Sequence, residues 1–318
     1  MMKSAVTTIG SAVLSLALFG CGDREATPTP AGADANVVEV TARGLQFEAP
    51  DEIASGWTTF RFTNASTMIH FAVVERLPEG IGIADQQAQV APVFQEGLNL
   101  LNAGEPEAAM EEFGKLPDWF SQIVFLGGPG LTSPGRTSEA TVYLEPGAYL
   151  LECYVKTNGV FHSYNPSPPA YGMVREFTVS DAASGAAEPA ATLEITLSSA
   201  RGIEVQGEPA AGEQTVAVHF EDQRTHENFV GHDVHVVRLT EDTDLEALAT
   251  WMDWSKPEGL ETPAPAEFIG GTNEMPAGET AYFTVQLEPG RYAWIAEVTA
   301  PDEKAMLKTF VVSPDDTG

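Results

Sequence analysis

The stretch Thr141-Val-Tyr-Leu-Glu-Pro-Gly-Ala-Tyr149 recurs later in the chain as Thr284-Val-Gln-Leu-Glu-Pro-Gly-Arg-Tyr292. A Phe-x-Gly-Gly motif precedes each copy, at Phe125 and at Phe268. Both motifs repeat at one offset, since 284 − 141 and 268 − 125 each give 143 residues. Self-similarity that keeps its order and spacing indicates tandem duplication of one domain.

The repeat extends outward from this stretch in both directions. Downstream, the segment that begins at Met173 matches the one at Met306, and upstream the segment at His70 matches the one at His232. Between the copies, residues 181–191 (DAASGAAEPAA) are small and poor in apolar side chains, which is typical of a linker. We therefore expect a first domain at 37–180, a linker at 181–191 and a second domain at 192–318.

Period-two alternation of apolar and polar residues dominates each copy. The segment 59–64 (TFRFTN) alternates in this way and is bounded by turn residues, which predicts a strand. Glu145-Pro-Gly147 predicts a turn that joins its flanking strands into a hairpin-like pair. About seven such strands per copy, without alternating helices, favour an all-β fold of two tandem antiparallel Greek-key β-sandwiches.

One insertion interrupts this pattern in the first copy. From Gln86 to about Phe120 the apolar residues follow helical spacing in two runs, and Pro106 opens the second run. The insertion therefore predicts a helical hairpin that packs as a lid on one end of the sandwich. A shorter version is expected in the second copy at 245–254. The apolar positions are Val90, Phe94, Leu98, Ala109, Met110 and Phe113.

The charge balance excludes one class of function at once. The 318 residues include 16 Lys+Arg and 46 Asp+Glu, which gives a net charge of −30. A chain this acidic is not a basic nucleic-acid binder. The only cysteines are Cys21 and Cys153, so the chain is not a disulfide scaffold.

Residues 1–20 have the pattern of an export signal. Lys3 precedes an apolar stretch that is too short to span a bilayer. The following Leu18-Phe-Gly-Cys21 resembles the bacterial lipobox, which implies that Cys21 is lipidated and begins the mature chain. An ordinary secretory signal with an incidental cysteine is the alternative.

The lipobox resemblance also implies a location. Residues 21–36 are small, polar and rich in proline and alanine, as expected of a flexible tether. The protein would be extracytoplasmic and lipid-anchored on the periplasmic side of a bacterial membrane. By resemblance to sorting rules, Gly22 in place of aspartate favours the outer membrane.

Four residues of the first copy carry a family resemblance. Cys153 ends the run from Gly147, His162 follows, and Gly172-Met173 enters the last strand. Together with the upstream His70, this order resembles the ligand pattern of cupredoxins such as plastocyanin, azurin and pseudoazurin.

The resemblance implies one type 1 copper ion held by His70, Cys153, His162 and Met173, with the edge of His162 as the electron port. A soft thiolate and two imidazoles suit copper in both oxidation states, and a long thioether contact tunes its potential. The gap of 11 residues between His162 and Met173 is long for the family, which leaves ligation by Met173 open.

The second copy lacks this set. Ala296 stands at the position of Cys153, and no histidine follows it. We expect the histidines of this copy to lie on a strand with their imidazoles facing solvent. A loose metal site is the alternative. We expect this domain to have a structural or partner-binding role. The histidines in question are His219, His226, His232 and His235.

No enzyme signature accompanies the copper pattern. Copper oxidases and nitrite reductases place histidine beside the ligating cysteine, whereas Glu152 and Tyr154 flank Cys153. The motifs HExxH and GxSxG, the P-loop and the Rossmann fingerprint are also missing from the sequence. The sequence therefore favours a protein that is not an enzyme.

Two classes of function remain open. One is a membrane-tethered blue copper protein in electron transfer or copper handling, with a redox partner such as a cytochrome. The other is a metal-free cupredoxin-like lipoprotein that acts as an envelope binding or structural module. The copper protein requires the sulfur of Cys153 and one ring nitrogen each of His70 and His162 to converge on one point, whereas the metal-free module does not.

Overall fold

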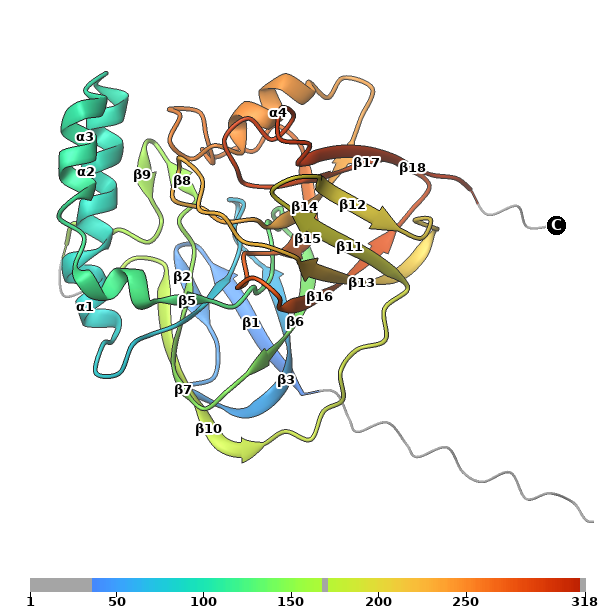
Figure 1. Cartoon of the computed structure of the whole chain (residues 1–318), viewed down its shortest axis with the longest axis horizontal. Helices are drawn as coiled ribbons and strands as arrows, with labels where there is room; N and C mark the ends of the chain where they lie inside the picture. Colours follow the sequence, from blue (N-terminus) through green and yellow to red (C-terminus); the bar gives the residue numbers. More distant parts are fainter. Residues whose placement is uncertain (1–35, 168–170, 315–318) are drawn as a thin grey trace, which may run out of the picture. The chain divides into compact units, whose positions relative to one another are not determined.

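Strands dominate the computed structural model, which describes residues 36–167 and 171–314 (Figure 1). The described part of the first half contains β1 (Val37–Arg43), β2 (Gln46–Glu48), β3 (Glu52–Asn64), β4 (Val73–Arg76), β5 (Val124–Phe125), β6 (Thr137–Leu144), β7 (Gly147–Glu152), β8 (Lys156–Thr157), β9 (Val160–Phe161) and β10 (Val174–Ala183). The second half contains β11 (Leu193–Ser198), β12 (Gly202–Gln206), β13 (Gly212–Phe220), β14 (Val234–Leu239), β15 (Glu267–Thr272), β16 (Thr280–Leu287), β17 (Gly290–Ile295) and β18 (Leu307–Val312).

Each half is built from two layers of strands. In the first half, β3 pairs with β1 and β6, while β7 pairs with β10 and β4. In the second half, one layer runs β12-β11-β13-β16 and the other β15-β14-β17-β18. The prediction of all-β sandwiches is confirmed. The strands are not all antiparallel, because β1 and β10 each run parallel to β3, and β11 runs parallel to β13.

The hairpin expected at Glu145-Pro-Gly147 is wrong. Strand β6 pairs with β3 and β16, whereas β7 pairs with β10 and β4. The turn therefore carries the chain from one layer of the sandwich to the other. Alternation and turn residues predict the two strands but do not specify their partners, because each strand can pair on either edge.

The two halves meet about a local two-fold axis. Antiparallel pairing of β6 with β16 sets Ala140 opposite Phe283, its counterpart at the offset of 143, and Pro129 likewise bridges to Thr272. Contacts between equivalent positions are the mark of a two-fold interface. One sheet is consequently continuous across both halves.

The repeated Gly-Gly motif lies at this interface, and its backbone conformation explains why these positions are glycine. Gly127, Gly128, Gly270 and Gly271 all have positive φ, from 70° to 131°. A Cβ on Gly271 would lie 2.2 Å from the carbonyl oxygen of Val234. Only glycine fits both the conformation and the close approach.

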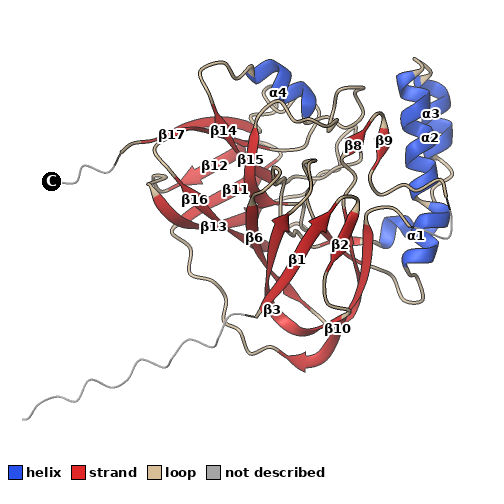
Figure 2. Ribbon diagram, turned by 180° about the vertical axis from the view of Figure 1, so that it is seen from behind, coloured by secondary structure: helices blue, strands red, loops and turns tan. Residues whose placement is uncertain are grey.

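The helical insertion has three helices rather than two. They are α1 (Ile83–Gln89), α2 (Ala91–Asn102) and α3 (Pro106–Phe113), followed by a 3-10 turn at Asp118–Gln122. Both views place α1–α3 beside the first half, and α4 (Leu245–Trp251) beside the second (Figures 1 and 2). The amide of Gln95 donates to Gly159, and its oxygen accepts from the Phe161 amide, so α2 holds the turn between β8 and β9.

Several expected segments fall at or beyond the edges of the described chain. Residues 1–35, with the export signal, Cys21 and nearly all of the tether, lie outside it. Strand β10 continues to Ala183, so the start of the expected linker at 181–191 is part of a strand. Among the described helices, none is long and apolar enough to cross a membrane.

Replacing Gly271 on β15 tests its close approach to the neighbouring strand β14. We expect Gly271→Ala to lower the free energy of unfolding by about 1–3 kcal/mol through the clash with Val234, in addition to about 1 kcal/mol for the left-handed backbone. Gly278→Ala is the matched control, because Gly278 has φ of 85° but open space around it. Urea denaturation measures both, and equal losses would contradict the packing argument.

Candidate metal centre

A buried asparagine positions the loop that carries His70. Asn64 ends β3, and its amide nitrogen donates to the carbonyls of Met68 and Thr132, at 2.7 and 2.8 Å. His70 then forms an isolated bridge with Thr132, whose amide donates to the His70 carbonyl at 2.7 Å. Asn64 and Thr132 thus fix the backbone around His70, and the residue is fully buried.

Backbone hydrogen bonds join the other three predicted ligands. Cys153 directly follows β7, and its amide donates to the carbonyl of Met173 at 3.1 Å. The amide of Met173 donates in turn to the carbonyl of His162 at 2.6 Å. Three short segments that follow one another along the chain therefore meet at one end of the first sandwich.

Three predicted ligand atoms converge at this point. The Sγ of Cys153 lies 3.4 Å from His70 Nδ1 and 3.9 Å from His162 Nδ1, and the two Nδ1 atoms are 3.2 Å apart. A point equidistant from these atoms lies about 2 Å from each, which is the length of a first-row metal bond to nitrogen or sulfur. One thiol and two imidazoles therefore fit a copper ion in both donor type and spacing.

Burial sets the protonation of this cluster. It lowers the pKa of His70 to about 4 and that of His162 to about 3, so both rings are neutral at pH 7 and offer lone pairs. Burial also raises the pKa of the Cys153 thiol to about 12. Metal binding would therefore have to displace the thiol proton, as is general for cysteine ligands.

The far nitrogen of His162 is held by groups from both halves. Thr157 Oγ1 lies 2.8 Å from His162 Nε2 and 2.8 Å from Thr262 Oγ1. A hydrogen bond at Nε2 orients the ring and leaves Nδ1 for a metal. His162 is only 2% exposed, so its edge does not lie at the surface, in contrast to the electron port implied by the resemblance.

Met173 reaches the cluster despite the long loop before it. A Cβ on Gly172 would lie 2.1 Å from the carbonyl oxygen of Ser163, so the loop ends pack backbone to backbone. This close approach returns the chain to the cluster whatever the length of the loop. Met173 is fully buried, and its backbone is hydrogen-bonded to both Cys153 and His162.

Two glutamines of α1 support the cluster, and sequence reasoning missed them. Gln86 Nε2 donates to the Glu152 carboxylate at 2.6 Å, and Gln87 Nε2 donates to the Ser163 carbonyl at 2.8 Å. Gln87 Oε1 also accepts from the Gly172 amide at 2.7 Å. Each of these three partners is the chain neighbour of a predicted ligand. Only the folded insertion brings the two glutamines there, so spacing along the chain gives no signal.

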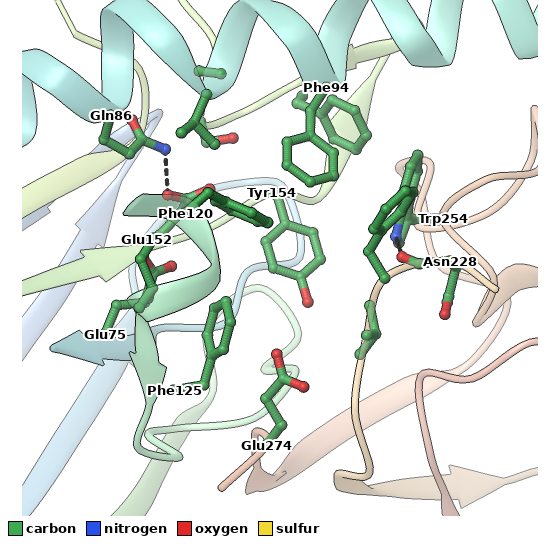
Figure 3. Close-up of a pocket in the computed structure, with 17 residues that line it drawn as sticks. Glu75, Gln86, Phe94, Phe120, Phe125, Glu152, Tyr154, Asn228, Trp254 and Glu274 are labelled. Atoms are coloured by element: carbon green, nitrogen blue, oxygen red, sulfur yellow. Dashed lines mark hydrogen bonds between the residues drawn. The ribbon is translucent and has the colours of Figure 1, made fainter. Parts of the chain in front are cut away.

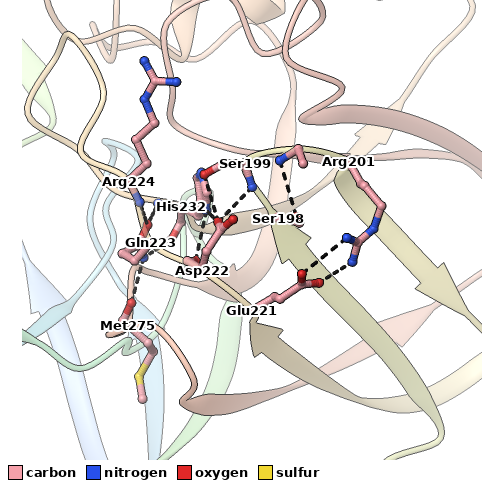
Figure 4. A network of polar contacts seen from close by, with 10 residues as sticks. Ser198, Ser199, Arg201, Glu221, Asp222, Gln223, Arg224, His232 and Met275 are labelled. Carbon is pink, nitrogen blue, oxygen red and sulfur yellow. Dashed lines mark hydrogen bonds and ion pairs between the residues drawn. The ribbon is translucent and has the colours of Figure 1, made fainter.

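The histidines of the second half are buried, and the expectation of solvent-facing imidazoles is wrong for most of them. His232 and His235 are fully buried, and His226 is 7% exposed. Figure 4 shows His232 among Ser199, Asp222 and Gln223, with its Nδ1 3.3 Å from the Asp222 carbonyl. His235 lies on β14, whose residues are buried on both faces of the strand, whereas His226 and His232 are buried in the loop before it.

The second half keeps the backbone of the site without its ligands. The Ala296 amide donates to Met306 at 3.0 Å, as the Cys153 amide does to Met173. A second group of converging polar atoms, from Asp233, His235 and Glu297, lies nearby.

Its hydrogen bonds favour a structural role for that second group. The Leu131 amide donates to His235 Nδ1 at 3.0 Å, so His235 Nε2 carries the proton that it donates to Asp233, also at 3.0 Å. Asp233 also accepts from the Glu297 amide at 2.7 Å. Both ring nitrogens of His235 are occupied, which leaves no lone pair for a metal.

Comparison with known proteins finds remote similarity to solved structures. No family model and no curated protein matches the chain. Among solved structures, auracyanin from Roseiflexus castenholzii is 17% identical over 38% of this chain and 95% of its own, with a TM-score of 0.27. Auracyanin A, a blue copper protein from Chloroflexus aurantiacus, is 21% identical over 45% and 98%, with a TM-score of 0.26.

A multicopper oxidase matches more of the chain but less closely. It is 14% identical over 87% of this chain and 88% of its own, with a TM-score of 0.21. At such low TM-scores the assignment of the metal centre rests on its own geometry.

The role of Gln87 can be measured without copper. Gln87→Ala removes both hydrogen bonds to the loop that carries His162 and Met173, which should cost about 1–2 kcal/mol and loosen this loop. We expect the Cys153 thiol to react with iodoacetamide on the order of tenfold faster, because a buried thiol reacts only after opening.

Gln89→Ala is the control for this measurement. Gln89 lies on the same helix but contacts only Asp85 and Trp119 through its side chain. Equal thiol reactivity in the two variants would contradict the supporting role of Gln87.

Proposed function

We propose that this protein is an extracytoplasmic type 1 copper protein that carries single electrons. The observation that carries the proposal is the convergence of one sulfur and two Nδ1 atoms within 3.2 to 3.9 Å of one another. When bound, copper would supply one-electron chemistry between its two oxidation states. His70, Cys153 and His162 would hold the ion, and Met173 is the proposed axial group.

The surroundings of these residues suit electron transfer. The side chains of His70, Cys153 and His162 are buried, and backbone hydrogen bonds hold the segments that carry them, so the ligands cannot rearrange freely between oxidation states. Copper storage or delivery would use the same ligands but would need an exchangeable ion. The buried histidines favour electron transfer, because neither ring is accessible for ligand exchange at the surface.

Copper titration of the full-length protein tests this proposal. We expect one equivalent of Cu(II) to produce an intense visible thiolate-to-copper band and the electron paramagnetic resonance signal of a type 1 site. Cys153→Ser should abolish the band, while His219→Gln should leave it unchanged, since His219 lies on β13 and contacts Thr280. A chain that gives no band and keeps a titratable thiol would instead be the metal-free binding or structural module.

The anchor and the partner are further parts of the proposal. We infer that Cys21 is lipidated and that residues 21–36 tether the domains to a bacterial membrane. The net charge of −30 would favour a basic redox partner such as a cytochrome. No catalytic role is proposed.

Fractionation of cells tests the anchor separately from the metal. We expect the protein to remain in the membrane fraction in high salt and to be released by detergent, because acyl chains rather than charge hold it. Cys21→Ser should move it to another fraction, while Cys153→Ser should not. A membrane-bound Cys21→Ser variant would contradict lipidation at this residue.

A further inference from the structure

A cavity lies on the opposite side of the Cys153 segment from the metal centre. Successive side chains of an extended chain point to opposite sides, so Glu152 and Tyr154 point away from the side of Cys153. Both residues line the cavity, which has a volume of about 70 Å³ (Figure 3). Its walls come from α1, α2, the strands of the first half and loops of the second.

The walls combine aromatic rings with carboxyl groups. Seven aromatic side chains line the cavity: Phe94, Phe120, Phe125, Tyr154, Phe161, Phe229 and Trp254. Three carboxyl groups face the same space, from Glu75, Glu152 and Glu274 (Figure 3). Aromatic faces and carboxylates both attract positive charge, and both are strengthened where water is excluded.

Glu75 is the carboxyl group of this cavity that lacks a partner among the described residues. It is 4% exposed, and burial and the nearby carboxyl groups of Glu152 and Glu274 act on it without any hydrogen bond. By contrast, Glu152 accepts from Gln86, and Glu274 accepts from the Gly231 amide. The Oδ1 of Asn228, which also lines the cavity, is likewise buried without a partner in the described chain. Unpartnered buried polar atoms are costly, so they indicate a ligand.

The electrostatics of the cavity favour a cation. None of the described basic side chains forms an ion pair with Glu75, Glu152 or Glu274. Burial raises the pKa of Glu75 well above its usual range and that of Glu274 to about 8. A bound positive charge would supply the compensation that these groups lack.

The spacing of the carboxyl groups favours an organic ion over a metal. Metal ions need ligand atoms that converge, and the converging groups among the described residues do not include Glu75, Glu152 or Glu274. The volume is roughly half that of a ~150 Å³ cavity that admits benzene, so it suits an ion of about two to three heavy atoms. We propose that this cavity binds a small organic ammonium ion, for which methylammonium is the simplest probe.

The proposal stands independently of copper and is tested on the copper-free, full-length protein. Calorimetric titration with methylammonium chloride, against sodium chloride at equal ionic strength, should show one saturable site. Glu75→Gln should weaken the affinity on the order of tenfold, because an amide cannot ionise to pair with a bound ammonium ion as a carboxyl group can. Glu79→Gln, an exposed change on the same segment, should have no effect.

A second variant keeps the test decisive if Glu75→Gln does not fold. Glu274→Gln changes a carboxyl group from the other half and should weaken methylammonium binding in the same direction. Tetramethylammonium, which is larger than the cavity allows, should bind more weakly than methylammonium. No saturable heat with the wild-type chain, equal affinity in the glutamine variants, or Glu75-dependent binding of Mn²⁺ without methylammonium binding would each overturn the proposal.

Discussion

Two backbone hydrogen bonds hold the candidate metal centre together: Cys153 N–H to Met173, and Met173 N–H to His162. They fix three segments that are separated by 9 and 11 residues in sequence, and so set the positions of three of the four candidate ligands. Gln87 adds a side-chain hydrogen bond at each end of the loop between His162 and Met173. The side chains of Cys153 and His162 therefore meet because the backbone has already been fixed, which is the condition for a preformed metal site.

The second half contributes to this site although it lacks the ligands. Lys156, which is fully buried, donates through Nζ to the carbonyls of Trp254 and Lys256 at 2.9 and 2.7 Å. The same loop of the second half brings Thr262 to Thr157, and thus to the far nitrogen of His162. Antiparallel pairing of β6 in the first half with β16 in the second fixes the position of the two halves relative to each other. The second half, which lacks the candidate ligands, in this way covers the half that has them.

The sequence predicted the features that depend on local pattern. The repeat at an offset of 143, the alternation in the strands and the helical run opened by Pro106 each correspond to structure. Pairing between strands was less predictable, as the turn at Glu145-Pro-Gly147 shows, because alternation does not select a partner. The order of His70, Cys153, His162 and Met173 was readable as a resemblance. The supporting side chains Gln86, Gln87, Thr157 and Thr262 were not, since tertiary contacts alone bring them to the site.

The central claim is that Cys153 and two histidines bind one copper ion directly. X-ray absorption at the copper edge of the copper-loaded protein measures this most directly, because it reports the elements and distances around the metal. The account predicts one short copper–sulfur distance together with two copper–nitrogen distances of about 2 Å. A spectrum that contains only nitrogen and oxygen neighbours, without a short sulfur contact, would contradict it.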